Sequence, residues 1–471
     1  MTDGEYDIVV IGAGPAGMAA SVEARKAGAS VLLLDEQDAV GGQIYRNVER
    51  ASSSMRDVLG HEYRYGGGLA KTFAASGASY GKRSTVIDIS RDGWVGYEHE
   101  GNVSYVKAGH IIIATGAAER PFPIPGWTLP GTMTVGAAQT MLKSSAAVPS
   151  PRAVLAGTGP LLYLFAAQVL RAGRKLGAIV DTSPRIPRLS AMRQLPGALR
   201  APRYLMKGFG LLSAIRKANV PHYWGAIDLR IDGLDKTESI SFSVGGRQHR
   251  IETDLVLLHQ GVIPNIQITQ ALRCDHRWDE LQMCWAPKLD IWGRTSLERI
   301  FVAGDGAGIG GALAAEYRGR IAALGVLADT GKLAKDEASR IAGRMRQALN
   351  KELAIRPFLD QLYQPPPSPS GPKDQSTIIC RCEEVTVGQI GEAVAIGCAG
   401  PNQLKAFLRA GMGPCQGRMC GLSVSQTISE MRDVPVTEVG IYRLRPPFKP
   451  VSLLTLSKMS IPDRQKQERR Q

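Results

Sequence analysis

The chain has 471 residues and a net formal charge of +14, with 44% hydrophobic and 21% charged residues. At roughly 100–200 residues per domain this length allows about two to four domains, and the composition excludes a disordered or fibrous chain. Seven cysteines are present, none before Cys274 and five between Cys380 and Cys420. An odd total gathered in one short segment argues against an extracellular disulfide framework and favours a local metal or cluster site.

The first elements of the chain are a strand, a glycine-rich turn, a helix and a second strand. An apolar strand begins at Tyr6, GAGPAG follows it, a helix extends to Lys26, and SVLLLDE forms the next strand. In such a G-x-G-x-x-G turn the glycines permit a tight bend, close approach of a pyrophosphate and close helix–strand packing, while a carboxylate after the second strand accepts ribose hydroxyls. The predicted dinucleotide-binding residues are Gly12, Gly14, Pro15, Ala16, Gly17, Asp35 and Glu36.

The same plan recurs about 145 residues later, where RAVLAGTGPLL precedes the strand LGAIVD. Gly157 and Gly159 are in place, but Leu162 stands where glycine or alanine normally lets the helix approach the strand. Asp181 ends the second strand and favours an unphosphorylated ribose. The pattern favours a retained fold without a nicotinamide nucleotide. A static adenine nucleotide and a working NAD(P)H site stay open as alternatives.

Between Asp181 and Asp228 the chain has no acidic residue but eight Lys or Arg. Because no nucleic-acid-binding signature accompanies them, we expect a solvated or subunit-facing basic surface and no binding of nucleic acid. An acidic partner or an anionic ligand is the alternative. The N-terminal stretch has no basic segment, and no run approaches the roughly 18 apolar residues of a membrane span. We therefore expect a cytoplasmic protein and leave attachment to a membrane open.

The cysteines near the C-terminus form two close pairs. Cys380-Arg-Cys382 is followed by a 32-residue gap and then by Cys415-Gln-Gly-Arg-Met-Cys420. Four thiolates in this spacing can hold either a [2Fe–2S] cluster or tetrahedral zinc, although C-x-C is tight for zinc. No histidine follows His276, so the site is all-thiolate. The three other cysteines, Cys274, Cys284 and Cys398, fit no ligand pattern and are expected to be packed thiols. Backbone amides around Gly413 and Gly417 would lie near the sulfides.

Further motifs give the first 330 residues a resemblance to the two-dinucleotide-binding flavoprotein family, which includes the disulfide reductases. The motifs are Gly41-Gly42-Gln43, Ala114-Thr115-Gly116 and Gly304-Asp305. The resemblance implies FAD, with Asp305 on the ribityl chain, a helix starting near Gly311-Ala312 directed at the flavin, and Val86 beside the adenine. Disulfide reductases carry redox cysteines beside the flavin. Because none occurs here before Cys274, the sequence argues against that activity.

The cysteine segment resembles the small helical [2Fe–2S] domain of a bacterioferritin-associated ferredoxin. The whole order of motifs, from residue 5 to about 445, resembles the larger FAD-containing subunit of heteromeric amine dehydrogenases, a group with opine oxidases, proline and hydroxyproline dehydrogenases, and hydrogen cyanide synthase. The resemblance implies a smaller partner of the D-amino-acid-oxidase type that oxidises a CH–NH bond to an imine. Electrons then leave through FAD and the cluster. A third small subunit, and an FMN at the interface between subunits, stay open.

Three alternatives to this function are kept: a self-contained NAD(P)H-dependent flavin and iron–sulfur reductase, a subunit of hydrogen cyanide synthase, and a nucleotide-binding scaffold without turnover. No arrangement of catalytic side chains can be assigned, and the electron acceptor and the substrate are not identified by the sequence.

We predict an α/β fold with two Rossmann-like domains and a small helical C-terminal domain. The predicted units are an FAD domain (1–120 and 252–330), a second nucleotide domain (121–251), a helical segment with a Pro-rich linker (331–376), the [2Fe–2S] domain (377–440) and a tail (441–471).

Overall fold

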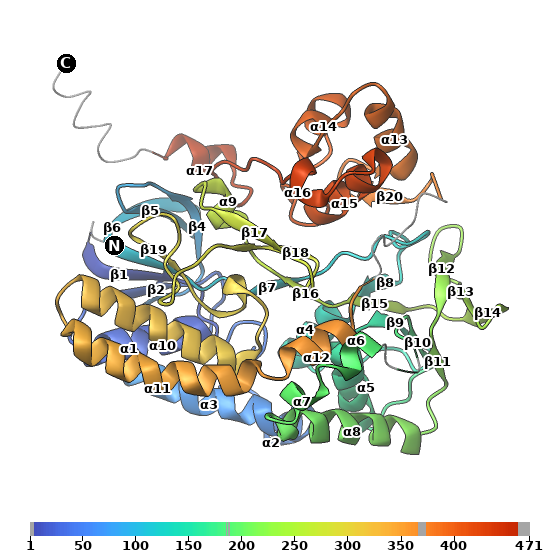
Figure 1. Cartoon of the computed structure of the whole chain (residues 1–471), viewed down its shortest axis with the longest axis horizontal. Coiled ribbons are helices and arrows are strands. Elements are labelled where there is room, and N and C mark those ends of the chain that lie inside the picture. Colours follow the sequence, from blue (N-terminus) through green and yellow to red (C-terminus); the bar gives the residue numbers. More distant parts are fainter. Residues whose placement is uncertain (1–3, 185, 187–188, 366–373, 460–471) are drawn as a thin grey trace.

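The computed structural model describes residues 4–184, 186, 189–365 and 374–459. The middle of the Pro-rich linker and the end of the tail therefore lie outside the described residues. So do Arg185 and Arg188, two of the eight basic residues after Asp181, which from the sequence could meet the phosphates of a nucleotide in the second unit. The fold class is the predicted one: two parallel-sheet units with helices, and a small helical unit at the C-terminal end (Figure 1).

The first unit is built on a sheet with the strand order β3-β2-β1-β6-β5-β4, with β19 added beside β6. Strands β1, β2, β3, β6 and β19 pair in parallel, and β4, β5 and β6 pair antiparallel. The strands are β1 (Glu5–Ile11), β2 (Val31–Leu34), β3 (Ser79–Gly81), β4 (Ser84–Ile89), β5 (Trp94–His99), β6 (Asn102–Ile113) and β19 (Ile300–Val302). Residues 8–11 of β1 and all of β2 are apolar and buried, as is usual for the central strands of a parallel sheet.

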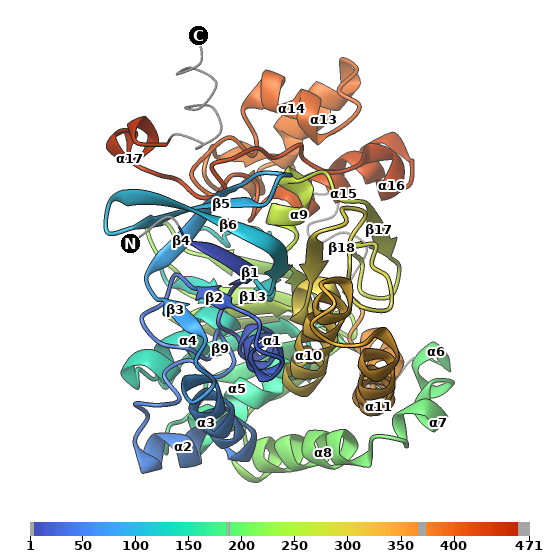
Figure 2. The ribbon, with the colours of Figure 1, turned by 90° about the vertical axis from the view of Figure 1, so that its left-hand side faces the viewer.

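Helices pack on one face of this sheet, with α1 against α10 and α10 against α11 (Figure 2). The helices and the 3-10 turn are α1 (Pro15–Lys26), α2 (Ser53–Leu59), α3 (His61–Ala74), η1 (Gly304–Ala307), α10 (Ala312–Asp329) and α11 (Lys335–Leu353). The close packing of α1 and α10 depends on a small residue. A Cβ at Gly319 would lie 2.1 Å from the carbonyl oxygen of Ala16, so a side chain there would separate the two helices.

The second unit has a five-stranded parallel sheet in the order β11-β10-β9-β15-β8. Its strands are β8 (Thr132–Thr134), β9 (Val154–Thr158), β10 (Ala178–Asp181), β11 (His222–Trp224) and β15 (Val256–Gln260), and an antiparallel sheet of β12 (Ile227–Asp232), β13 (Ser239–Val244) and β14 (Arg247–Glu252) lies beside it. Its helices are α4 (Val135–Ser145), α5 (Pro160–Arg171), α6 (Leu189–Met192), α7 (Leu195–Ala198) and α8 (Pro202–Lys217).

Short elements join the two units. Strand β7 (Ala117–Glu119) pairs with β16 (Val262–Pro264), and β17 (His276–Asp279) pairs with β18 (Cys284–Pro287). The helices α9 (Gln267–Ala271) and α12 (Arg356–Leu362) complete this region. Because both chain crossings between the units occur at β7 and β16, the carboxyl edges of the two parallel sheets are linked through one small ribbon.

The C-terminal unit, which we call the cysteine module (residues 377–440), lies at one end of the molecule in both ribbon views. It contains β20 (Ile378–Cys380), β21 (Val385–Thr386), α13 (Val387–Ala395), α14 (Pro401–Leu408), α15 (Gly421–Arg432) and α16 (Val436–Val439). Thr386 and Gln389 form a capping box at the start of α13. The module has a core of its own, which includes Ile390, Leu404, Val424 and Ile428. After it, the tail contains α17 (Leu453–Ser457).

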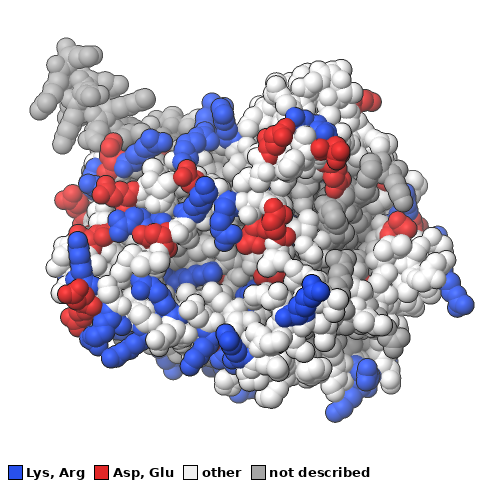
Figure 3. All heavy atoms as spheres, viewed as in Figure 1, with Lys and Arg blue, Asp and Glu red and all other residues white. Residues whose placement is uncertain are grey.

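The basic segment predicted between Asp181 and Asp228 covers α6, α7 and α8. Arg203 pairs with Glu352 and Lys207 pairs with Glu62, so part of its charge is compensated within the chain. In Figure 3, most Lys and Arg side chains at the lower edge of the molecule lie on the left, below α11, and a few lie at the lower right, where Figure 1 shows α8. Among the helices of the described residues, none is long and apolar enough to cross a membrane.

Candidate functional site

The first glycine-rich turn, which we call the first loop (residues 12–17), lies between β1 and α1. Gly12 has φ +105°, and a Cβ there would lie 2.5 Å from the carbonyl oxygen of Ala114. A Cβ at Gly17 would lie 1.9 Å from the carbonyl oxygen of Gly12. Pro15 is the first residue of α1, where its missing N–H costs no hydrogen bond, and Ala16 is buried behind it. The loop therefore exposes backbone and a helix N-terminus, which suits a pyrophosphate.

A second backbone segment, Gly41-Gly42-Gln43, lies against the first loop. The N–H of Gly41 donates to the carbonyl oxygen of Ala13 at 2.8 Å, and a Cβ at Gly42 would lie 2.9 Å from the Cα of Gly14. Both glycines have positive φ. The predicted flavin segment is thus brought beside the predicted pyrophosphate loop, while the Gln43 side chain is exposed.

Asp35 connects the end of β2 to the first loop. Its Oδ2 accepts a hydrogen bond from the N–H of Ala13 at 2.6 Å, and its Oδ1 accepts one from the N–H of Gln37 at 2.7 Å. Burial raises the pKa of Asp35, and the two backbone donors oppose that shift. Each oxygen retains a lone pair, so the carboxylate can also accept from a ribose. Glu36 instead points to the tail, where its Oε1 lies 2.8 Å from Nζ of Lys449.

Asp305 organises the turn between β19 and α10. Its Oδ1 accepts hydrogen bonds from the N–H groups of Gly310, at 2.8 Å, and Gly311, at 3.0 Å. Gly311 has φ +95° and precedes α10, which begins at Ala312. A Cβ at Gly304 would lie 2.9 Å from the Cβ of Ala16, so this turn also packs against the first loop. The predicted ribityl-binding residue, Asp305, therefore lies beside the predicted pyrophosphate loop. We call the surface formed by the first loop, residues 41–43, Asp35 and the Asp305 turn the FAD cradle.

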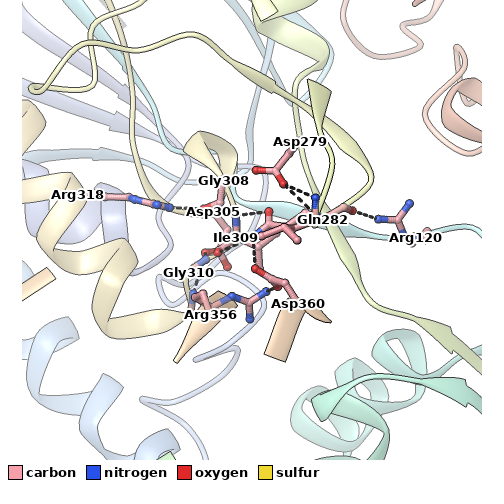
Figure 4. A network of polar contacts seen from close by, with 12 residues as sticks. Arg120, Asp279, Gln282, Asp305, Gly308, Ile309, Gly310, Arg318, Arg356 and Asp360 are labelled. Atoms are coloured by element: carbon pink, nitrogen blue, oxygen red, sulfur yellow. Dashed lines mark hydrogen bonds and ion pairs between the residues drawn. The ribbon is translucent and has the colours of Figure 1, made fainter. Parts of the chain in front are cut away.

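Residues that the sequence did not single out hold this turn in place (Figure 4). The Gln282 side chain donates to the carbonyl oxygen of Ile309 at 3.2 Å and accepts from its N–H at 3.3 Å. Gln282 also donates to Oδ2 of Asp360 at 3.2 Å, and Asp360 pairs with Arg356 on α12. Arg318, which is deeply buried, donates to the carbonyl oxygens of Gly304 and Gly308, and burial lowers its pKa. No sequence motif marks these contacts: the partners of Gln282 are far away in the sequence, and those of Arg318 are backbone carbonyl groups.

The cradle includes one buried side-chain hydroxyl, that of Thr115. The hydroxyl of Thr115, next to the first loop, is buried and has no hydrogen-bond partner among the described residues. Ala114 and Gly116 flank it just after β6, and Val86 is buried in β4. Buried polar atoms are nearly always satisfied, so an orphaned hydroxyl inside a glycine-lined cradle fits a bound ligand. The residues present fit FAD.

A buried lysine lies beside this cradle. Lys143, on α4, donates from Nζ to the carbonyl oxygen of Gln43 at 3.0 Å and to Oε1 of Gln139 at 2.9 Å. Burial, with a smaller contribution from the charge of Arg46, lowers the pKa of Lys143 to about 7. No sequence pattern indicates this site, because a lone lysine on an amphipathic helix is ordinarily solvated.

The second loop (residues 157–162) keeps a glycine-rich turn, with a different backbone at its second glycine (φ −72° at Gly14 and +125° at Gly159), but not an accessible carboxylate. Gly157 and Gly159 have φ +129° and +125°, and Leu162 is fully buried in the core. Asp181 is 0% exposed: its Oδ2 accepts from the hydroxyl of Tyr163, and its Oδ1 accepts from the N–H of Ser183 at 2.7 Å.

Aromatic rings close over this carboxylate. The rings of His222 and Trp224 are stacked with their centroids 3.9 Å apart, and Nε2 of His222 lies 3.7 Å from Oδ2 of Asp181. The rings of Tyr163 and Tyr363 are 6.0 Å apart. The group that would recognise a ribose is thus occupied by the protein's own side chains. These residues do not fit an NAD(P) ribose.

The four cysteines of the two pairs, which we call the thiol set (Cys380, Cys382, Cys415 and Cys420), lie together in the cysteine module. Cys420 shares hydrogen bonds with Cys380 and Cys415, and Cys415 shares one with Cys382. The bonds from Cys420 lower the pKa of Cys380 to about 6 and that of Cys415 to about 5. The pKa of Cys420 is raised by the same bonds and by burial.

Backbone amides surround these sulfurs, from Gly411 and Glu383 to Cys380 and from Met419 and Gly417 to Cys415. Within the part of the chain that the structure describes, no three His, Cys, Asp or Glu side chains are grouped to hold a metal ion. The four thiols nevertheless lie close enough to one another to shift each other's pKa. Four thiols with nearby N–H donors have the ligand chemistry of a [2Fe–2S] cluster, which takes two thiolates on each of two irons, and also that of a tetrahedral metal ion.

The three remaining cysteines are not part of the thiol set. Cys274, Cys284 and Cys398 are buried and free. Burial raises the pKa of Cys284 to about 12 and raises that of Cys398, as is expected for inert packed thiols.

Comparison with known proteins agrees with this architecture. A family model described as "Pyridine nucleotide-disulphide oxidoreductase" matches residues 6–322, and one described as "Sarcosine oxidase A3 domain" matches residues 374–458. The opine oxidase A subunit of Agrobacterium tumefaciens (strain Ach5) is 45% identical over 96% of this chain and 91% of that protein. Hydrogen cyanide synthase subunit HcnB of Pseudomonas aeruginosa is 32% identical over 94% of this chain and 96% of that protein.

The structure of L-proline dehydrogenase from P. horikoshii superposes with a TM-score of 0.68 over 96% of this chain and 79% of that chain. Its sequence identity is 16%, so this likeness concerns the fold alone. A thioredoxin reductase from T. acidophilum superposes with a TM-score of 0.50 over 69% of this chain and 99% of that chain, at 23% identity, and is likewise a match of fold.

The fold and the first site define a flavoprotein oxidoreductase with two dinucleotide-binding units. The chain belongs to the pyridine nucleotide-disulphide oxidoreductase family and, within it, to the group of the opine oxidase A subunits.

Proposed function

We propose that this chain is the FAD- and [2Fe–2S]-bearing electron-transfer subunit of a heteromeric dehydrogenase or oxidase that acts on the CH–NH bond of an opine or amino acid. A partner flavoprotein of the D-amino-acid-oxidase type oxidises the substrate to an imine, and this chain removes the electrons. The observation that carries the proposal is that one chain has both a glycine-lined cradle that suits FAD and, in a separate unit, the four cysteines of the thiol set.

Each part of the chain has a defined task in this proposal. The first loop, Asp35, Thr115 and Asp305 would hold FAD, which supplies two-electron chemistry when it is bound. Gln282 and Arg318 would keep the Asp305 turn in position. The thiol set would hold the cluster, and the surrounding amides would tune its potential.

The relatives that match nearly the whole chain are named as A subunits of opine oxidase, which supports both a partner chain and this class of substrate. We further propose a cytoplasmic location, where thiols remain reduced. A third small subunit, and an FMN at the interface between subunits, can be tested in the same complex.

The alternative of a self-contained NAD(P)H-dependent reductase is supported only by the glycine geometry of the second loop. The closure of Asp181 by Tyr163 and Ser183 opposes it.

The test is to copurify the chain with its partner and to assay dye reduction with a panel of opines and amino acids, and with NADH. We expect reduction with one of the amines and none with NADH, together with iron, sulfide and flavin in the purified complex. NADH oxidation by this chain alone, at rates comparable to the amine-driven reaction, would overturn the proposal.

A further inference from the structure

The loop between two members of the thiol set reaches the FAD domain through Arg418. One terminal nitrogen of Arg418, Nη1, donates to Oε1 of Gln267 and to the carbonyl oxygen of Phe448, both at 2.8 Å, and to Oε1 of Gln416, within the loop, at 3.4 Å. The other, Nη2, donates to the carbonyl oxygen of Pro414, also within the loop, at 3.4 Å. The forked guanidinium thus holds its own loop and a neighbouring surface together.

Gln267 connects the Arg418 contact to the FAD cradle through a short series of hydrogen bonds. It is the first residue of α9 and is only 8% exposed. Its backbone N–H donates to Oδ1 of Asn265 at 3.4 Å, and the N–H of Asn265 donates to the carbonyl oxygen of Gly116 at 2.9 Å. Gly116 directly follows Thr115, the residue with the orphaned hydroxyl. Gln267 and Asn265 therefore link the Arg418 side chain to the cradle.

Phe448, the second partner of Arg418, anchors the tail on the same domain. Its ring is 4% exposed and belongs to the core that contains Val86, and its N–H donates to the carbonyl oxygen of Ile87 at 2.8 Å. Lys449 follows and pairs with Glu36, next to Asp35. The tail thus crosses the predicted adenine and ribose end of the FAD site, while Arg418 fixes its start against the cysteine loop.

We propose that Arg418 is a positioning residue that docks the thiol loop on α9, and that electrons pass between FAD and the cluster inside this chain across the contact of Arg418 with Gln267. This inference rests on the proposed function. Reduced flavin gives up two electrons and two protons in becoming FAD. The two electrons pass to the cluster one after the other. After each transfer a one-electron acceptor such as ferricenium reoxidises the cluster, and the two protons go to solvent.

The full chain, carrying flavin and iron, is reduced anaerobically and mixed with ferricenium in a stopped-flow instrument. Flavin oxidation is followed by its absorbance and cluster oxidation by freeze-quench electron paramagnetic resonance. In Arg418→Ala we expect flavin oxidation to slow at least tenfold while cluster oxidation and iron content stay unchanged. Gln267→Ala breaks the same contact from outside the cysteine module, so it should give the same result without any change in the cluster loop. Arg418→Lys should restore part of the rate.

Arg432→Ala is the matched control, because Arg432 donates to the carbonyl oxygen of Ala399 and pairs with Glu438 within the module. Its flavin oxidation should stay within twofold of the wild type. Hydrogen exchange at α9 and around Phe448 should rise in Arg418→Ala and Gln267→Ala but not in the control. Unchanged flavin oxidation in Gln267→Ala, or loss of iron in Arg418→Ala, would overturn the proposal. A wild-type chain without iron would instead refute the proposed function itself.

Discussion

The two dinucleotide-binding units of this chain share a glycine-rich turn before a helix and differ in the second glycine of that turn and in what surrounds it. Each loop begins with a glycine of positive φ and has a proline at the first position of the helix, but the glycine just before that proline has φ −72° in the first loop and +125° in the second. In the first unit, Asp35 is half-buried, and the Thr115 hydroxyl has no partner within the described part of the chain. In the second, Asp181 is sealed beneath Tyr163 and His222. The comparison indicates that glycines preserve a fold, whereas accessible polar groups beside the turn decide whether it binds a nucleotide.

The largest effect is expected from closing the first cradle. In Gly17→Val the new side chain would collide with the carbonyl oxygen of Gly12, which a Cβ alone approaches to 1.9 Å. We expect loss of more than about nine-tenths of the bound flavin, measured as flavin absorbance per protein. Gly68→Ala, on α3, is the control, because a Cβ there meets nothing within 4 Å. Full flavin content in Gly17→Val would show that FAD lies elsewhere.

The next effect concerns the closed unit. The wild-type chain should show no saturable binding of NADH or ADP below about 1 mM, a free energy weaker than about 4 kcal/mol. Tyr163→Ala removes the hydroxyl that occupies Asp181 and should create measurable ADP binding by calorimetry, with flavin content unchanged. Micromolar binding of NADH to the wild type would abolish the distinction between the two units.

A smaller effect is expected from the orphaned hydroxyl. Thr115→Val should weaken FAD binding by about tenfold, while the apoprotein should be as stable as the wild type because the hydroxyl makes no hydrogen bond to the described residues. Thr158→Val is the matched substitution in the second unit, where the hydroxyl contacts Ser183. It should leave FAD affinity unchanged. Equal losses of FAD affinity in both variants would contradict the assignment of Thr115.

The last prediction concerns Lys143, which lies between the two units. Its pKa is lowered to about 7 by burial, against about 10.4 in an unfolded chain. The folded protein therefore favours the neutral amine over the charged one. As a result, the free energy of unfolding falls as the pH falls from about 10 to 7. In Lys143→Met the urea midpoint should lose that part of its pH dependence. Parallel curves for the variant and the wild type would show that Lys143 is charged in the folded state.

Local patterns predicted much of this molecule and missed a definable part of it. The first loop and the thiol set were predicted because short spacings carry their chemistry, and Asp305 was predicted from the resemblance to a family of flavoproteins. The clasp of Gln282 on Ile309, the closure of Asp181 by Tyr163 and the contact of Arg418 with Gln267 were not. These contacts depend on side-chain packing or join residues far apart in sequence, so no periodicity or motif records them. The tail, too, was predicted only as a segment that follows the [2Fe–2S] domain, whereas Phe448 packs into the FAD domain.

The proposed path of electrons from amine to flavin to cluster is tested most directly by an anaerobic titration of the copurified complex, with iron and flavin quantified in the same sample. We predict about two iron atoms in this chain for each FAD, bleaching of the flavin by the amine substrate and appearance of a reduced-cluster signal. Excess NADH should leave the flavin absorbance unchanged. Bleaching by NADH, or a complex that oxidises its amine without iron in this chain, would contradict the proposed path.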